Sequence, residues 1–240
     1  MENKFQQLFS VKKPIIGMIH LAGSSQIEIV KRAIGELIIY EQEGVDGAII
    51  EDYHADGQGL NNAVTEICQE QWTIKLGVNY LRNPGSAFEI AQVNDLSFIQ
   101  LDSVQGSRDR HLEQRKALPY LAVFGGVRFK YQPSTGMSLE EDIVQGKLRC
   151  DAIVTTGEGT GIETPLQKLR EFRKHLQASP LIVGAGVDLA NVYSQLIVAD
   201  AAIVGSYFKP EKNTYARVSR DLVREFMEKV KEVRLIESAE

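Results

Sequence analysis

Eight apolar runs of strand length alternate along this chain with segments of helical periodicity, and this alternation limits the possible folds more than any other feature. The runs are apolar on both faces, as expected of parallel strands covered by helices. They span residues 14–20, 46–52, 73–81, 98–102, 120–130, 151–156, 181–186 and 200–206. Eight strand–helix units within 240 residues match the count and length of a (β/α)8 barrel.

A doubly wound open sheet alternates in the same way and is the competing interpretation. The count of eight and the absence of an early glycine fingerprint favour the barrel. The chain has no Pro/Gly/Ser-rich linker, low-complexity tract or charge block that would divide it. We therefore predict an α/β fold in which residues 1–240 form a single (β/α)8 TIM barrel domain.

Three sequence positions carry the spacing of a helix capping box and predict helix starts. They are Ser86 with Glu89, Ser138 with Glu141, and Thr164 with Gln167, the last followed by Pro165 at the predicted first helical position.

Composition excludes several classes of protein. A formal net charge of -5 and a pI near 5.5 argue against a general nucleic-acid binder, which needs a basic face. No apolar run approaches the roughly 20 residues of a membrane span, and residues 1–14 lack the apolar segment of a signal peptide. Cys68 and Cys150 are too few for a disulfide scaffold, so we expect reduced thiols and a cytoplasmic protein.

Two nearby runs, "PLIVGAGVDLANV" and "DAAIVGSYFK", each end in glycine plus another small residue. In a barrel these two strands are neighbours, so Gly184, Gly186, Gly205 and Ser206 would converge at the carboxyl-terminal rim. Glycine lets a ligand approach backbone N–H groups, and this part of a barrel commonly binds phosphate. The pattern predicts a phosphate site, although glycines that only ease tight turns would look the same.

Several motifs together resemble the BtpA/SgcQ family over nearly the whole chain: "KPIIGMIHLAGS", "GVNYLRN", "VRFK", "TTGEGTG" and "VGAGVDLANV…ADAAIVGSYFK". The resemblance implies a barrel of the ribulose-phosphate-binding type. The family takes its name from a cyanobacterial factor needed for photosystem I reaction-centre proteins to accumulate, and many members occur where no photosystem exists.

The chain departs from the family pattern at two places on the predicted rim. The family commonly has an arginine–valine–asparagine strand where this chain has Gln100 and Asp102, and a lysine–histidine pair where it has Lys130 and Tyr131. These changes bear on the ligand more than on the fold.

Catalytic residues of barrels project from the carboxyl ends of several strands. His20, Glu51, Asp102 and Lys130 end strands that are otherwise apolar, and we predict that they are catalytic. His20 could shuttle a proton, and Lys130 could polarise a carbonyl or form a Schiff base. Side chains alternate along a strand, so only one of Glu51 and Asp52 should face the mouth, as a general base or as an ion-pair partner of Lys130.

Three further polar residues follow the strands and are predicted to bind substrate: Asn79, Arg82 and Thr156. Arg82 could instead cap its loop. A metal is a competing interpretation, because Glu51, Asp52 and His54 carry ligands that suit Mg2+ or Mn2+, with His20 and Asp102 on nearby strands. No known metal spacing is matched, so we predict neither a metal nor another cofactor.

Two functions remain open. The first is an enzyme of the isomerase, aldolase or lyase class that acts on a small phosphorylated sugar or nucleoside-like metabolite, with no nucleic-acid partner and with homo-oligomer formation possible. The second is a non-catalytic factor that assembles or stabilises other proteins, as in photosystem I biogenesis. Fold alone does not separate the two, and the mixed acid–base rim favours the enzyme.

Overall fold

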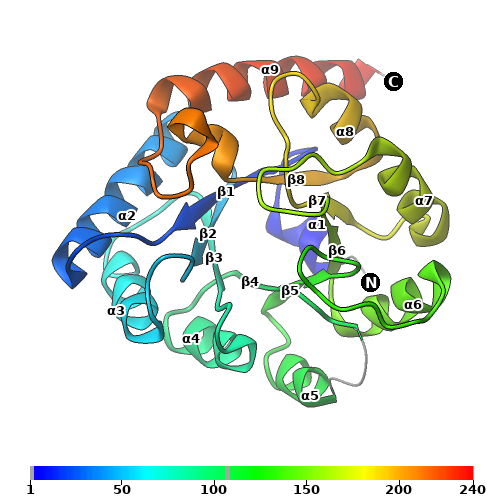
Figure 1. Ribbon diagram of the computed structural model, residues 1–240, viewed down its shortest axis with the longest axis horizontal. Helices are drawn as coiled ribbons and strands as arrows, with labels where there is room; N and C mark the ends of the chain where they lie inside the picture. Colours follow the sequence, from blue (N-terminus) through cyan, green and yellow to red (C-terminus); the bar gives the residue numbers. More distant parts are fainter. Residues whose placement is uncertain (1–2, 106–108, 240) are drawn as a thin grey trace.

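The computed structural model describes residues 3–105 and 109–239, which form a ring of helices around a central barrel (Figure 1). The barrel is closed, each strand is parallel to its neighbours, and β1 pairs with β8. The strands are β1 (Ile15–His20), β2 (Gly47–Glu51), β3 (Lys75–Asn79), β4 (Phe98–Leu101), β5 (Ala122–Gly126), β6 (Ala152–Thr155), β7 (Leu181–Val183) and β8 (Ala201–Val204). This topology confirms the predicted TIM barrel over the open sheet.

Of the helices in the described residues, the first covers the amino-terminal end of the barrel and the others cover its outside. They are α1 (Lys4–Leu8), α2 (Gln26–Gln42), α3 (Gly57–Ile67), α4 (Ala87–Val93), α5 (Asp109–Ala117), α6 (Leu139–Arg149), α7 (Leu166–Leu176), α8 (Val192–Val198) and α9 (Arg220–Ala239). Short 3-10 turns are η1 (Pro84–Ser86), η2 (Ser206–Phe208) and η3 (Pro210–Lys212). A large apolar cluster fills the layer between strands and helices, and a second cluster fills the barrel interior.

The register brings one belt of polar side chains to the carboxyl ends of the first four strands. His20 pairs with Glu51, Glu51 with Asn79, and Asn79 with Gln100. Residues paired across parallel strands point to the same face, and all four side chains are buried. The belt therefore lies at the mouth, directly above the apolar interior.

Aromatic rings close the opposite end of the barrel, where α1 lies behind the strands in Figure 1. Phe5 packs edge-on against Phe124 with ring centroids 5.7 Å apart, and Phe9 lies 6.4 Å from Phe98. Phe98 and Phe124 stack on each other inside the barrel at 4.5 Å. The interior thus opens toward the carboxyl ends of the strands, where the polar belt lies.

One of the three predicted capping boxes is present. Ser138 and Glu141 cap α6 reciprocally, side chain to backbone in both directions. The prediction for Ser86 is wrong. The η1 turn precedes α4, so Ser86 has helical dihedral angles (φ -77°, ψ -10°) instead of the extended ones that bring a capping side chain back over the first turn.

The capping prediction for Thr164 is also wrong, because its hydroxyl is used elsewhere. It donates to the Ala185 carbonyl at 3.1 Å, and Pro165 is the N-cap of α7 instead of its first helical residue, so the helix begins one residue later than predicted. The side chain therefore ties the loop between β6 and α7 to the loop after β7.

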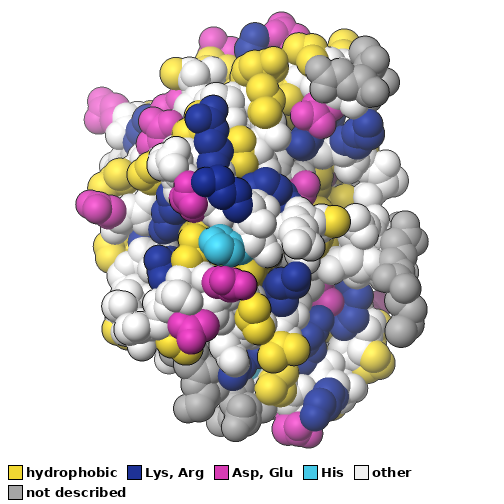
Figure 2. Space-filling model, turned by 90° about the vertical axis from the view of Figure 1, so that its right-hand side faces the viewer, with side chains coloured by type: hydrophobic (Ala, Val, Ile, Leu, Met, Phe, Trp, Pro, Cys, Tyr) yellow, Lys and Arg dark blue, Asp and Glu magenta, His cyan; other side chains and the backbone are white. Residues whose placement is uncertain are grey.

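The surface carries charges of both signs. Figure 2 shows the side of the molecule on which α6 and α7 lie. Basic, acidic and apolar side chains are interspersed on this side. Both cysteines are free thiols: Cys68 is half-buried and Cys150 is buried. Among the described residues, every helix is too short or too polar to pass through a lipid bilayer.

Candidate functional site

A small pocket opens at the carboxyl-terminal mouth of the barrel, with a cavity volume of about 30 Å³. Seven of the residues that we predicted for the site line it: His20, Glu51, Lys130, Gly184, Gly186, Gly205 and Ser206. They come from the ends of β1 and β2 and from the loops after β5, β7 and β8. The chain thus brings ionisable side chains and bare backbone to one place.

Glu51 stands at one end of a hydrogen-bonded row of amides and carboxyls. The Asn79 side-chain amide donates to Glu51 Oε1 at 2.8 Å and to Asp102 Oδ1 at 3.0 Å. The Gln100 amide donates to the same Asp102 oxygen at 3.0 Å. Asn79 and Asp102 do not line the pocket themselves, and Asn79 holds Glu51, which does.

The environment of Glu51 favours the protonated carboxyl. Burial, together with the negative charge of Asp102, raises the pKa of Glu51 to about 8, although Lys130 and Asn79 act in the opposite direction. Burial also raises the pKa of Asp102. Near neutral pH, Glu51 can therefore donate a proton from inside the pocket.

His20 is held neutral beside it. Burial, and then the positive charges of Lys209 and Lys130, lower the pKa of His20 well below its usual value. His20 Nε2 lies 3.7 Å from Glu51 Oε2, which is too long for a hydrogen bond. Since both groups are uncharged near pH 7, this contact is an acid beside a base rather than an ion pair.

Asp52 points away from the pocket, as alternation along the strand requires. Its carboxylate is fully buried, accepts from the Leu81 N–H at 2.7 Å, and pairs with the Arg82 guanidinium at 2.8 Å. The same guanidinium donates to the Asp52 and Ala55 carbonyls. The structure therefore places Arg82 as the support of the loop after β2, outside the pocket lining.

Lys130 enters the pocket from the loop after β5. Its backbone N–H donates to Thr156 Oγ1 at 2.7 Å, so Thr156 positions Lys130 and does not line the pocket. Among the described residues, no carboxylate lies within 4.0 Å of the Lys130 ammonium. The predicted alternative of an ion pair between Lys130 and Glu51 or Asp52 is absent there.

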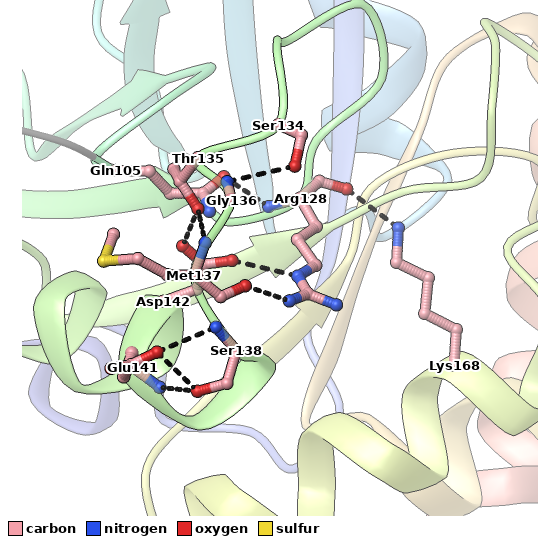
Figure 3. Close-up of polar contacts among 10 residues, drawn as sticks. All are labelled: Gln105, Arg128, Ser134, Thr135, Gly136, Met137, Ser138, Glu141, Asp142 and Lys168. Atoms are coloured by element: carbon pink, nitrogen blue, oxygen red, sulfur yellow. Dashed lines mark hydrogen bonds and ion pairs between the residues drawn. The ribbon is translucent and has the colours of Figure 1, made fainter.

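A second set of contacts fixes this loop from the outside (Figure 3). The Arg128 guanidinium bonds to Asp142 at 3.0 Å and to the Met137 carbonyl at 3.1 Å, so it faces away from the pocket. Lys168 donates to the Arg128 carbonyl at 2.8 Å and to the Thr156 carbonyl at 2.6 Å. One half-buried lysine on α7 thereby joins the two loops that meet at Lys130.

The ends of β7 and β8 present backbone instead of side chains. The hydrogen bonds of the described residues leave the N–H groups of Ala185, Gly186, Gly205 and Ser206 without a protein acceptor. The Gly184 N–H is used, since it donates to the Thr155 carbonyl at 2.9 Å. Four residues with such N–H groups line one pocket, an arrangement that can bind an anion.

Gly186 and Gly205 also have steric reasons to lack a side chain. Gly186 has a φ of +68°, and a Cβ there would lie 2.3 Å from backbone atoms of Ile162 and Glu163. A Cβ on Gly205 would lie 2.9 Å from His20 Cε1. Glycine at these positions lets the loop after β6 and the His20 ring approach the anion site.

The loop between β6 and α7, "TTGEGTG" and the residues that follow, lies over this end of the pocket, in yellow-green in Figure 1. Two tyrosines from other loops hold its tip. The Tyr53 hydroxyl donates to Thr160 Oγ1 at 3.2 Å, and the Thr160 N–H donates to the Tyr131 hydroxyl at 3.0 Å. The loop thus covers the anion site, as its glycine content allows.

A comparison with known protein families agrees with the motifs quoted in the sequence analysis. The chain matches the model of the BtpA family over residues 11–111 and 124–232. The chain belongs to the BtpA family. It is 28% identical to an uncharacterized protein of Thermococcus kodakarensis, over 93% of this chain and 97% of that one. It is 24% identical to the photosystem I biogenesis protein BtpA of Synechocystis, over 94% of this chain and 91% of that one.

Solved structures share the fold of this BtpA-family chain at low identity. Leishmania donovani OMP decarboxylase is 12% identical with a TM-score of 0.70, over 98% of this chain and all of that one. Phosphoribosyl anthranilate isomerase from Thermus thermophilus is 13% identical with a TM-score of 0.64, over 92% and 99%. These likenesses establish the TIM barrel for the BtpA-family chain.

The structure adds residues to the site that sequence reasoning missed. Gln100 lines the pocket, and its spacing of two residues from Asp102 was the signal that both share a face. Lys209 is 1% exposed, donates to the Thr214 carbonyl at 2.9 Å, and has a pKa lowered to about 8 by burial. Lys209 ends the motif "DAAIVGSYFK", but its burial depends on how the segment after β8 packs and could not be read from the motif.

The residues considered as metal ligands do not form a group that could hold a metal ion. Within the described ranges 3–105 and 109–239, no group of three or more His, Cys, Asp or Glu side chains is arranged to hold a metal ion. Asp52 is turned to Arg82, and His54 bonds to Thr214 Oγ1 at 3.0 Å. The alternative of a Mg2+ or Mn2+ site therefore finds no support in the geometry of this BtpA-family protein.

Proposed function

We propose that this protein is an enzyme of the isomerase, aldolase or lyase class that acts on a small phosphorylated sugar or nucleoside-like metabolite. The observation that carries the proposal is the meeting of two features in one pocket. Bare N–H groups at the ends of β7 and β8 face the same space as His20, Glu51 and Lys130. A phosphate held on the backbone would present the rest of the molecule to the ionisable groups.

The phosphate would lie at Gly186, Gly205 and Ser206, the part of the pocket that offers unpaired donors and the Ser206 hydroxyl. Hydrogen bonds to a charged group contribute about 1.5–3 kcal/mol each, so three or four of them would anchor a small ligand. The fold neighbours named above include an isomerase and a decarboxylase, which supports this class of reaction by analogy.

The proposed roles follow from the protonation states in the pocket. Glu51 is protonated near pH 7 and would act as a general acid toward a carbonyl or hydroxyl oxygen. His20 is neutral and would accept a proton. Lys130, which has no ion-pair partner among the described residues, would polarise a carbonyl or add to it. The negative charge of Asp102 would help to keep Glu51 protonated, and Asn79 joins the two carboxyl groups.

A thermal-shift screen of phosphorylated metabolites against their dephosphorylated forms tests the proposal, because a ligand that binds the native state raises its stability. We expect stabilisation by phosphorylated forms only. Ser206→Asp should abolish it by placing a like charge in the site, with little change in the midpoint of the free protein. Ser179→Asp makes the same charge change beside Pro180, away from the mouth pocket, and should behave as wild type.

Equal stabilisation of the wild type by phosphorylated and dephosphorylated forms would count against the phosphate site. The second candidate, an assembly factor, is favoured by one observation, the similarity to a photosystem I biogenesis protein. A protein that binds phosphorylated ligands but turns none of them over would favour this candidate over the enzyme.

A further inference from the structure

Gln100 carries an acceptor that the protein leaves unused. Its side chain is 2% exposed and lines the mouth pocket. The amide nitrogen donates to Asp102 Oδ1 at 3.0 Å, whereas Oε1 has no hydrogen-bond partner among the described residues. Because the nitrogen must face the carboxyl oxygen that accepts from it, the amide oxygen is turned the other way.

A second unpaired polar atom lies in the same pocket. His20 is 4% exposed, and its Nδ1 has no hydrogen-bond partner within the part of the chain that the structure describes. Because the neutral ring presents Nε2 to Glu51 as the base, Nδ1 carries the proton and is a donor. Buried polar atoms are almost always paired, and one left unpaired beside a pocket indicates a partner that comes from outside the protein.

The two sides of the pocket are therefore chemically different. The β7 and β8 side offers N–H donors to an anion, whereas Gln100 Oε1 on β4 offers an acceptor and His20 Nδ1 on β1 a donor. A hydroxyl group fits this pair better than a protonated amine, because a hydroxyl can both donate and accept a hydrogen bond.

We propose that Gln100 is a specificity-determining residue that accepts a hydrogen bond from a hydroxyl group of the ligand, which makes the ligand a phosphorylated polyol or sugar. This inference rests on the proposed function, since it needs the phosphate at Gly186 and Ser206. It adds the chemistry of the other end of the ligand, and it assigns a role to the residue at which this chain departs from the usual family pattern.

The test uses two phosphate monoesters of equal chain length, ribitol 5-phosphate and n-pentyl phosphate, with inorganic phosphate as a third probe. Titration calorimetry on the wild type should give a dissociation constant at least about 10-fold lower for ribitol 5-phosphate than for pentyl phosphate. Gln100→Met should remove most of this preference and leave the affinity for pentyl phosphate unchanged.

Gln114→Met is the matched control. Gln114 also has an amide oxygen without a partner in the described residues, but it lies on α5 and donates to the Gly85 carbonyl, outside the pocket. It should keep the wild-type preference. If Gln100→Met does not fold, Gln100→Leu replaces it in the same comparison of the two esters.

The outcomes separate this inference from the proposed function. Equal affinity of the wild type for both esters would overturn the role of Gln100 while the phosphate site stands. A preference for ribitol 5-phosphate that Gln100→Met retains would also overturn it. Failure to bind either ester or inorganic phosphate would overturn the phosphate site, and the inference with it.

Discussion

The two halves of the barrel mouth are built in different ways. β1 to β4 end in His20, Glu51, Asn79 and Gln100, buried side chains that are linked to one another or left open toward the pocket. β7 and β8 end in glycine, where the backbone itself meets the pocket. The first half has groups whose protonation the interior shifts, and the second has dipoles that do not titrate.

The difference shows how one fold separates holding a ligand from reacting with it. Backbone donors at the glycine end keep their geometry and charge at every pH, which suits them to hold an anion that is bound but does not react. Side chains at the polar end have pKa values moved by burial, which suits proton transfer. Each of the following predictions addresses one half and uses the other half, or a distant position, as its reference.

The largest effect is expected at the glycine end. Gly186→Ala should lower the free energy of unfolding by about 3 kcal/mol and abolish phosphate binding, because the added Cβ meets the backbone of Ile162 and Glu163 at a positive φ. Gly136→Ala is the matched control, with a φ of +75° and nothing within 4 Å of its Cβ. It should cost about 1 kcal/mol and leave binding intact. Equal costs for the two variants, measured by chemical denaturation, would show that the close approach is unimportant.

At the polar end, His20→Asn and Lys130→Met should each lower turnover on a ligand found in the screen by at least about 100-fold, or about 2.7 kcal/mol of activation free energy. Both variants should stay folded, since no ion pair of Lys130 is broken within the described residues. The measurement is a pair, the denaturation midpoint and the turnover number. Marked destabilisation with unaltered turnover would argue that these residues are structural.

Glu51→Gln should change how stability depends on pH. The folded pKa of about 8 lies above the usual value of 4.5, so the folded state keeps a proton that the unfolded state has lost. The wild type therefore loses stability as pH rises from about 4.5 to 8, by at most about 1.4 kcal/mol per unit. Glu51→Gln removes this slope, so its advantage over the wild type should grow between pH 5 and pH 8 in thermal melts. A constant difference across that range would mean that Glu51 is not protonated in the folded state.

The smallest effect is expected at Arg82, which supports a loop at the polar end but faces away from the pocket. Arg82→Met should leave the affinity for inorganic phosphate within about two-fold of the wild type. It should lower the free energy of unfolding by about 1 kcal/mol, because the Arg82 side chain is half-exposed and Asp52 still accepts the hydrogen bond from the Leu81 N–H. Titration with phosphate provides the check. A loss of affinity of 10-fold or more would show that Arg82 contributes to ligand binding.

Much of the fold was predictable from local patterns. All eight apolar runs contain a strand, and period-two alternation separates Glu51, which lines the pocket, from Asp52, which does not. The capping box at Ser138 formed because its partners lie in the same helical turn. Those at Ser86 and Thr164 did not, because a preceding turn and the Ala185 carbonyl competed for the same backbone and side-chain groups.

The sequence by itself determined the barrel, the end of it that carries the polar groups, and the pair of glycine-ended strands, since each of these depends on the order and period of residues along the chain. Only the tertiary structure decided which of those groups share a pocket. The open acceptor of Gln100, the burial of Lys209 and the turn of Arg82 toward Asp52 all depend on contacts between segments far apart in sequence. The pKa of Glu51 was decided in the same way, because the desolvation that raises it exists only once the barrel has closed around the carboxyl.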